Sequence, residues 1–158
     1  MNNDKRVRIV IGHYGSGKTE FSLNYATKLA EMNKKVMLVD LDVVNVYFRS
    51  REKAEKLTDM GIKVIGGSIE ANAIDIPMIP GEVTTAFQDK SYDAVLDIGG
   101  DPAGARTLGR YVEYLTEDNY DMFFVLNANR PETQSVEKAI EYMTKIQDTA
   151  RAKVTGIV

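Results

Sequence analysis

The chain has 158 residues, enough for one domain with a hydrophobic core, and its 44% apolar and 27% charged residues exclude a disordered chain. Its 20 Lys and Arg against 23 Asp and Glu give a formal net charge of -3, which excludes general binding of nucleic acid. It has no cysteine, no signal-like start and no run of about 18 apolar residues, so we expect one cytoplasmic domain over residues 1–158, with no transmembrane segment.

Short apolar runs alternate along the chain with segments of helical periodicity, which predicts an α/β fold. The predicted strands are residues 7–11, 36–41, 62–65, 94–98, 122–126 and 154–158. None of these runs alternates between apolar and polar residues, so we expect a mostly parallel sheet covered by helices on both faces, a three-layer sandwich. The last run has nothing after it to cover the sheet, so we expect a C-terminally truncated domain.

The helices are predicted between these strands. They are expected at residues 18–32, 47–60, 82–88 and 136–150. Asn33 and Gly61 are suited to ending the first two helices, and Arg130-Pro131-Glu132 introduces the last. Residues 66–81, which include Pro77 and Pro80, are expected to form a loop.

The segment after the first strand fits the phosphate-binding pattern G-x-x-x-x-G-K-[ST]. It reads Gly12-His13-Tyr14-Gly15-Ser16-Gly17-Lys18-Thr19 and lies between a strand and a helix, as the motif requires. Its glycines let backbone N–H groups turn toward phosphate oxygens, and the helix start adds partial positive charge. We expect Lys18 to neutralise the β and γ phosphates and Thr19 to place its hydroxyl on Mg²⁺.

Asp97 ends the apolar run of the fourth strand. After Thr19, it is the second residue that we expect at the metal, where its carboxylate would contact the water molecules bound to Mg²⁺. Three residues later, Gly100 would let a backbone N–H reach the γ-phosphate and sense its loss. Asp101 could serve in place of Asp97, but only Asp97 directly ends the apolar run. The sequence therefore favours Asp97.

Asp40 and Asp42 end the second strand. Ligands of open parallel sheets bind outside the carboxyl ends of the strands, so both carboxylates are expected beside the phosphate loop. One would accept a hydrogen bond from a metal-bound water and the other would orient or deprotonate an attacking group. We assign Lys18, Asp40 and Asp42 to the chemical step, and Thr19, Asp42 and Asp97 to the metal. In the alternative, the two acidic residues only end a strand.

The three elements, in this order and spacing, resemble the ParA/MinD-type branch of P-loop NTPases, which includes the nitrogenase iron protein and cobyrinate-synthase-like ATP-binding domains. They are residues 12–19, 36–42 and 95–100, and residues 42–52 are similar to uncharacterised bacterial ATP-binding proteins of this group. The resemblance covers most of the chain. It implies a P-loop NTPase fold, ATP and Mg²⁺, a switch aspartate near the second strand and often a nucleotide-dependent homodimer.

The sequence departs from that family at His13 and Tyr14. The family carries a signature lysine where His13 stands and a glycine where Tyr14 stands, and that lysine crosses a dimer interface to the partner's phosphates. His13 lacks a permanent positive charge, and the bulk of Tyr14 would hinder two loops from approaching, so we expect any homodimer not to depend on nucleotide. In the alternative, His13 is a solvent-facing loop residue.

Three functions remain open at this stage. The first is an ATPase switch with a protein partner, the second a metabolic enzyme, like dethiobiotin synthetase, that passes phosphate to a small acceptor, and the third a non-hydrolysing nucleotide-binding module. Candidates for contact with substrate or nucleotide follow the strands, although a solvated surface or helix capping would also explain them. They are Arg49, Arg51, residues 74–80, Arg106, Arg110, Asn127, Asn129 and Arg130.

Overall fold

Strands and helices alternate along the chain in the computed structural model, which describes residues 3–42, 51–66 and 80–158. The strands are β1 (Val7–Ile11), β2 (Val36–Leu41), β3 (Ile62–Ile65), β4 (Asp93–Ile98), β5 (Tyr120–Phe124) and β6 (Gly156–Ile157). The helices are α1 (Lys18–Glu31), α2 (Arg51–Asp59), α3 (Pro80–Gln88), α4 (Pro102–Gly109) and α5 (Val136–Ala150), with a 3-10 helix η2 (Val112–Tyr114). The predicted α/β class and all six predicted strands are confirmed.

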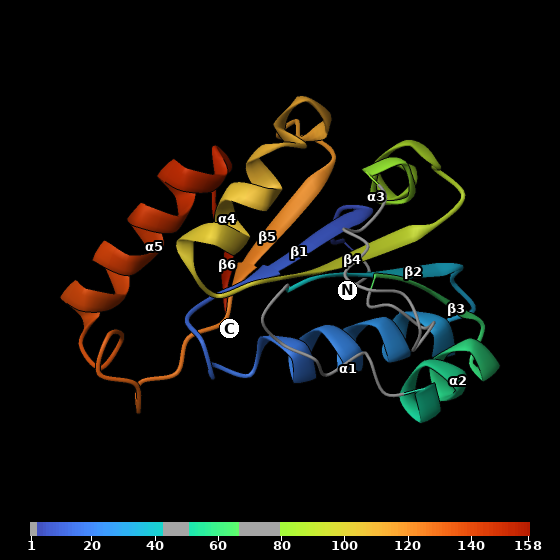
Figure 1. Ribbon diagram of the computed structural model, residues 1–158, viewed down its shortest axis with the longest axis horizontal. Helices are drawn as coiled ribbons and strands as arrows, with labels where there is room; N and C mark the ends of the chain where they lie inside the picture. Colours follow the sequence, from blue (N-terminus) through green and yellow to red (C-terminus); the bar gives the residue numbers. More distant parts are fainter. Residues whose placement is uncertain (1–2, 43–50, 67–79) are drawn as a thin grey trace, which may run out of the picture.

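The strands form one parallel sheet in the order β3-β2-β4-β1-β5-β6. Helices α1 and α2 cover one face, and α3, α4 and α5 cover the other (Figure 1). Successive residues of β1 serve opposite faces: Val10 packs in a cluster with Leu29 of α1, whereas Ile9 packs in a cluster with Phe87 of α3 and Leu108 of α4. The expected three-layer sandwich is therefore present.

Burial differs between the centre and the margins of the sheet. Every residue of β1 and β2 is buried, and so is all of β4 except its first residue. In β5, however, Asp121 and Phe123 are only half-buried. Phe123 contacts the rings of Phe21 and Tyr25 of α1, but α1 packs mainly over β4, β2 and β1. The outermost strands β3 and β6 are partly exposed. The expectation of two buried faces thus applies to the three central strands.

Helix α4 and the short η2 were not predicted from the sequence. Asp101 caps α4 by accepting a 2.7 Å hydrogen bond from Gly104 N, and Pro102 is the first helical residue. An Asp followed by Pro is a helix-start signal that could have revealed this helix. Gly104 and Gly109 weaken the helical pattern of α4, since glycine is a poor helix former.

The other helices follow the prediction closely. Helix α1 ends at Glu31, and Asn33 adopts a left-handed φ of 59° just beyond it. Helix α3 begins at Pro80, two residues earlier than expected. The predicted start of the second helix, 47–50, and most of the predicted loop, 67–79, lie outside the described residues. In the ranges that the structure covers, no helix is long and apolar enough to cross a membrane.

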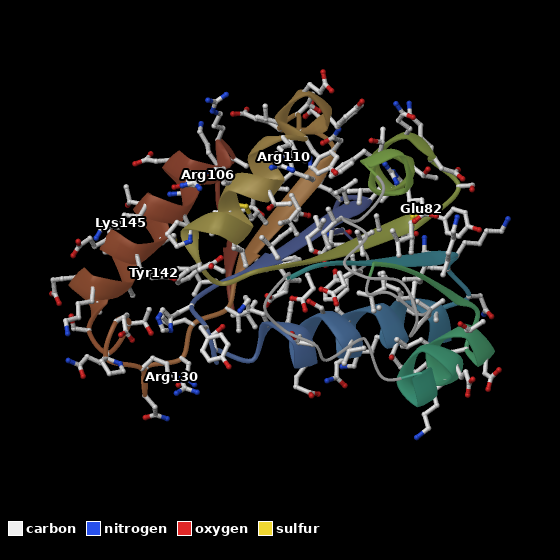
Figure 2. The ribbon with its side chains drawn as sticks, in the orientation of Figure 1. Glu82, Arg106, Arg110, Arg130, Tyr142 and Lys145 are labelled. Carbon is white, nitrogen blue, oxygen red and sulfur yellow. The ribbon has the colours of Figure 1, made fainter. Side chains whose placement is uncertain are left out.

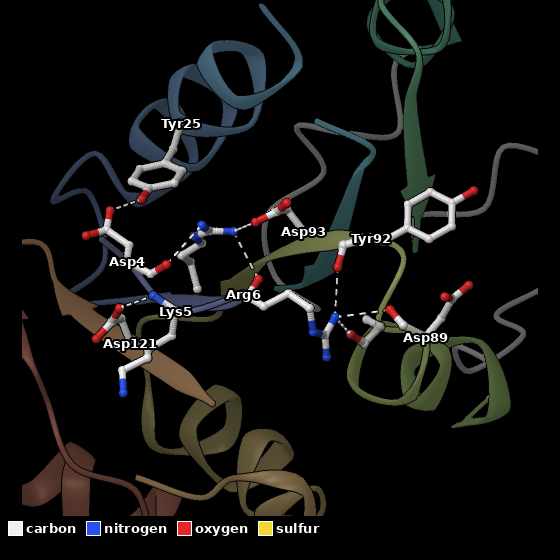
Figure 3. A network of polar contacts seen from close by, with 10 residues as sticks. Asp4, Lys5, Arg6, Tyr25, Asp89, Tyr92, Asp93 and Asp121 are labelled. Atoms are coloured by element: carbon white, nitrogen blue, oxygen red, sulfur yellow. Dashed lines mark hydrogen bonds and ion pairs between the residues drawn. The ribbon is translucent and has the colours of Figure 1, made fainter. Parts of the chain in front are cut away.

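Two arginines fix the amino-terminal edge of the sheet (Figure 3). Arg8 is buried and forms an ion pair with Asp93 at the start of β4. The Arg6 guanidinium donates hydrogen bonds to backbone carbonyls around the end of α3, those of Ala86, Phe87, Asp89 and Tyr92. Lysine has no planar fork that could serve four carbonyls in this way. These contacts lie at the sheet edge opposite to the carboxyl ends of the strands.

Candidate nucleotide-binding site

The loop between β1 and α1 curls tightly at the carboxyl edge of the sheet. Gly12 and Gly15 have φ angles of 156° and 70°, which L side chains rarely adopt. A Cβ atom on Gly12 would lie 2.3 Å from the carbonyl oxygen of Val125, just after β5. The backbone of the loop therefore approaches its neighbour more closely than a residue with a side chain would permit.

The start of α1 offers polar groups that fit phosphate oxygens. Its N-cap residue is Gly17, and no side chain caps the helix. The backbone N–H groups at the start of a helix carry partial positive charge, which favours an anion such as phosphate at this point. In the described part of the chain, the buried Ser16 Oγ has no hydrogen-bond partner. A buried hydroxyl without a partner is rare, and a phosphate oxygen would satisfy it.

Lys18 lies under this loop. Its side chain is buried, and its Nζ donates to the carbonyl oxygen of His13 at 3.4 Å. Burial lowers the pKa of Lys18, while the nearby carboxylates of Asp97, Asp42 and Asp101 act in the opposite direction. The ammonium group is thus held between the phosphate loop and three acidic residues.

Asp97 is fully buried beneath the phosphate loop. Thr19 Oγ1 donates a 2.8 Å hydrogen bond to its Oδ2, and Ser22 Oγ donates a 3.2 Å hydrogen bond to its Oδ1. Burial raises the pKa of Asp97 to about 6, and the hydrogen bonds and the Lys18 charge oppose that rise. Ser22 was missed from the sequence, although it lies three residues after Thr19 and so on the same helix face.

Asp40 and Asp42 lie at the same edge of the sheet. Asp40 is directly opposite Asp97 in the pairing of β2 with β4, and its Oδ1 accepts a 3.0 Å hydrogen bond from Asp42 N. Both side chains are buried. Among the described residues, no group of three or more His, Cys, Asp or Glu forms a metal cluster by itself. The oxygen atoms of Thr19, Asp42 and Asp97 suit Mg²⁺, which usually takes one or two protein oxygens together with waters and phosphates.

Gly100, which follows β4, packs closely against the phosphate loop. A Cβ atom on Gly100 would lie 2.6 Å from Gly12 O and 2.7 Å from Tyr14 N, so only glycine fits there without displacing the loop. Asp101 caps α4, whereas Asp97 contacts Thr19 of the loop. This geometry favours Asp97 for the metal site, and its role there stays a prediction.

His13 points into its own chain. Its side chain is 19% exposed, its ring meets the Tyr142 ring edge-on at 5.1 Å, and its Nε2 lies 3.5 Å from Glu132 Oε2. Tyr14, by contrast, is 65% exposed. The interpretation of His13 as a solvent-facing loop residue is therefore wrong, because α5 and the segment before it cover the ring.

Residues after β5 also donate hydrogen bonds to the phosphate loop. The sequence analysis left the contacts of these residues open. Arg130 donates to the carbonyl oxygen of Gly15 through Nε at 3.2 Å and Nη2 at 3.1 Å, and Asn127 Nδ2 donates to the same oxygen at 3.3 Å. Ser135 caps α5, so neither Asn127 nor Asn129 does. Nothing local in the sequence signals these contacts, because the partners are 112 and 115 residues apart.

The other candidate arginines lie elsewhere. Arg106 on α4 and Arg110 directly after α4 are exposed (Figure 2), away from the phosphate loop. Arg49, residues 74–79 and the side chain of Arg51 lie outside the described residues. Of the candidate arginines whose side chains the structure describes, Arg130 alone contacts the loop.

A family model described as the CobQ/CobB/MinD/ParA nucleotide binding domain matches residues 8–158. The chain belongs to this family. The match covers the phosphate loop and every strand from Arg8 onward, and the parallel six-stranded sheet is that of a P-loop NTPase. The predicted family and fold of this nucleotide-binding domain are thus confirmed.

Solved structures share the fold of this nucleotide-binding domain at low identity. A nucleotide-binding protein from Archaeoglobus fulgidus in complex with ADP is 16% identical, with a TM-score of 0.60 over 96% of this chain and 64% of that one. The BceF tyrosine kinase domain is 18% identical, with a TM-score of 0.62 over 97% and 67%. The cell division protein FtsY from Thermotoga maritima is 17% identical, with a TM-score of 0.59 over 96% and 51%.

The domain therefore spans 64% of the A. fulgidus protein and about half of FtsY. No curated protein matches the chain.

Proposed function

We propose that this domain binds ATP together with Mg²⁺ and hydrolyses it, and that the change of nucleotide alters a surface recognised by a partner. The observation that carries the proposal is the buried hydrogen bond between Thr19 and Asp97, directly beneath an uncapped helix start and a glycine loop. The A. fulgidus protein of the same fold binds ADP, which supports adenine as the base.

Each polar group of the site has a role in this proposal. The Lys18 ammonium contacts the β and γ phosphates, while the first N–H groups of α1 and Ser16 Oγ bind further phosphate oxygens. Thr19 would hold Mg²⁺ through its hydroxyl and Asp97 through a metal-bound water. When bound, Mg²⁺ neutralises the phosphate charge that develops during transfer.

The carboxylates that end β2 would act on the attacking group. Asp42 or Asp40 accepts a hydrogen bond from a water and orients it toward the γ-phosphate. Asp42 would also contact the metal's water shell. Gly100, which already touches the loop at Gly12 and Tyr14, would sense the γ-phosphate through its backbone N–H.

A second candidate function, transfer of phosphate to a small acceptor molecule, is favoured by the environment of His13. The His13 ring is held by Tyr142 and Glu132 of its own chain, so the loop offers no lysine-like charge to a second subunit. A domain of this kind would transfer phosphate to a small acceptor instead of switching between assemblies. Both functions use the same phosphate site and differ in whether water or a metabolite attacks.

Binding and turnover measurements test these proposals. We expect calorimetry to show that ATP and ADP bind more tightly than GTP and GDP, with a gain on adding Mg²⁺. Phosphate release by the protein alone supports the ATPase, and release or ATP consumption only in the presence of a metabolite library supports the transferase. Binding without turnover in either assay would contradict both and leave a non-hydrolysing module. Absence of nucleotide binding would overturn the site itself.

A further inference from the structure

Tyr142 reaches from α5 into the candidate site. Its hydroxyl donates a hydrogen bond to the carbonyl oxygen of Gly100, and its ring contacts His13 of the phosphate loop. Figure 2 shows the side chain between α5 and α4. Burial raises the pKa of the Tyr142 hydroxyl, and the charges of Asp101 and Glu132 raise it further, so the group remains a neutral donor near pH 7.

This contact fixes the peptide that follows Gly100. A peptide unit is planar and trans, so a hydrogen bond that orients the Gly100 carbonyl also orients the N–H of Asp101 on the opposite side. The Gly100 Cα itself lies against the phosphate loop, where a Cβ atom would be 2.8 Å from Lys18 Nζ. Gly100 is therefore held between the loop, which binds phosphate in the proposed function, and Tyr142.

The opposite side of α5 faces solvent and carries two large apolar side chains. Val136 is 70% exposed and Ile140 is 53% exposed, one helical turn apart. Tyr142 is thus on the helix that connects the turn at Gly100 with an exposed apolar surface. On the inner side, Ile146 packs in the same hydrophobic cluster as Leu108 of α4, so α4 and α5 are tightly associated.

We propose that Tyr142 is a positioning residue that couples the turn at Gly100 to α5, so that exchange of ATP for ADP changes the conformational freedom of α5. The proposal rests on the proposed nucleotide site. When the γ-phosphate is present, Gly100 is held against the loop and its carbonyl keeps the hydrogen bond to Tyr142. When the γ-phosphate is lost, Gly100 relaxes, the hydrogen bond weakens and α5 becomes freer to open.

The single hydrogen bond between Tyr142 and Gly100 limits how strongly the nucleotide can affect α5. A coupling cannot exceed the difference in interaction free energy between the two states, and a neutral hydrogen bond changes an equilibrium by about two- to tenfold. We therefore expect amides of residues 136–150 to exchange with deuterium about two- to tenfold faster with ADP than with a non-hydrolysable ATP analogue.

The test compares Tyr142→Phe with the wild-type protein, each with Mg²⁺ and either ADP or the analogue. Phenylalanine keeps the ring that packs on His13 and Phe124 and removes only the hydroxyl. Tyr120→Phe is the matched control, because it removes a hydroxyl that accepts a hydrogen bond from Lys153 N at 2.9 Å, remote from the site. Calorimetry of ADP binding is run on all three proteins.

We expect Tyr142→Phe to bind ADP as the wild type does, to lose the nucleotide-dependent exchange of α5 and to lower kcat more than it changes KM. Tyr120→Phe should keep the nucleotide-dependent exchange. Wild-type protein that binds nucleotide but shows equal α5 exchange with ADP and the analogue overturns the coupling, whatever the variant does. A nucleotide-dependent exchange that persists in Tyr142→Phe overturns the role of Tyr142. Wild-type protein that binds no nucleotide overturns the proposed function instead.

Discussion

The hydroxyl of Thr19 and the carboxylate of Asp97 are joined by a buried 2.8 Å hydrogen bond that spans 78 residues of sequence. It connects the first turn of α1 to the carboxyl end of β4. Two sequence motifs that were recognised separately are therefore one unit in the folded protein. A substitution at either residue changes the environment of the other, which guides the choice of variants below.

Replacing Lys18 with Ala should weaken nucleotide binding and leave the fold intact. The variant loses a charge-assisted contact to the β and γ phosphates, so we expect affinity to fall about ten- to a hundredfold in calorimetry. Lys28→Ala is the matched control, since Lys28 is an exposed lysine of the same helix. Equal ATP affinities for wild type and a well-folded Lys18→Ala would exclude the phosphate-loop assignment.

Replacing Asp97 with Asn should reduce the gain in affinity that Mg²⁺ provides. Asn retains the shape of the side chain but lacks the charge that the metal's water shell prefers, so binding of nucleotide without metal should change little. Asp101→Asn is the control, because Asn is also a good N-cap and preserves the start of α4. A larger loss of Mg²⁺ dependence in Asp101→Asn would move the metal role to Asp101.

The pKa of Asp97 predicts that the protein free of metal and nucleotide loses stability as pH rises. The pKa in the folded state, about 6, is above the ordinary value of 3.8, so between these pH values the folded protein binds more protons than the unfolded chain. Its free energy of unfolding therefore decreases through this range, by on the order of 3 kcal/mol, and the decrease ends above pH 6.

Urea unfolding of wild type and Asp97→Asn in EDTA at pH 4.5 and pH 8 checks this. Because Asn does not titrate, the free energy of unfolding of wild type minus that of the variant should be smaller at pH 8. Titrating groups that do not interact with Asp97 cancel in this difference. A difference that stays constant, or grows with pH, would show that burial does not raise the pKa of Asp97.

Replacing Arg6 with Met should destabilise the fold without affecting nucleotide binding. Methionine preserves the apolar stem and removes the guanidinium that serves the carbonyls of Ala86, Phe87, Asp89 and Tyr92. Hydrogen bonds from a charged donor contribute about 1.5–3 kcal/mol, and we expect a loss of this order in urea unfolding. Lys5→Met removes a neighbouring ammonium group whose hydrogen bond to Glu117 O, at 3.4 Å, is exposed, and should change the free energy of unfolding by less than about 0.5 kcal/mol.

Association should not depend on nucleotide, since the His13 ring is engaged by Tyr142 and Glu132 and the exposed Tyr14 side chain projects from the loop. Light scattering should give the same mass with ADP and with a non-hydrolysable ATP analogue. His13→Lys would place an ammonium on the loop, where it could contribute to a charge pair with a partner's phosphates. Conversion of wild-type monomer to dimer by the analogue would refute this prediction.

The sequence was most informative where structure depends on local pattern or on burial of both faces of a strand. Strands β1 to β4 each include at least four residues of the predicted apolar runs, and β5 includes three. The runs were clear in β1, β2 and β4 because helices cover these strands on both sides. The phosphate loop was recognised because its glycines, Lys18 and Thr19 are adjacent in sequence.

Contacts between distant segments could not be predicted in the same way. The hydrogen bonds of Arg130 to Gly15 and of Tyr142 to Gly100 depend on how the segment after β5 and helix α5 pack against the sheet. The inward orientation of His13 has the same cause. Helix α4 was missed for another reason. Its segment is short and contains two glycines, so the helical apolar pattern is weak, and the helix is stabilised by the Asp101 cap and by packing against the core.

The central position of β1 determines when the protein can fold during synthesis. The first strand of this domain, β1, pairs on one side with β4 and on the other with β5, whose residues follow more than 80 positions later. Until Ile98 has been made, β1 has neither neighbour, and its four apolar residues have no sheet to join. Pairings between such distant segments form slowly and leave apolar surface exposed in the meantime. A nascent chain of this domain therefore contains its phosphate-binding sequence long before it can bind a nucleotide. Between the synthesis of β1 and that of β4 and β5, holdase chaperones can bind β1.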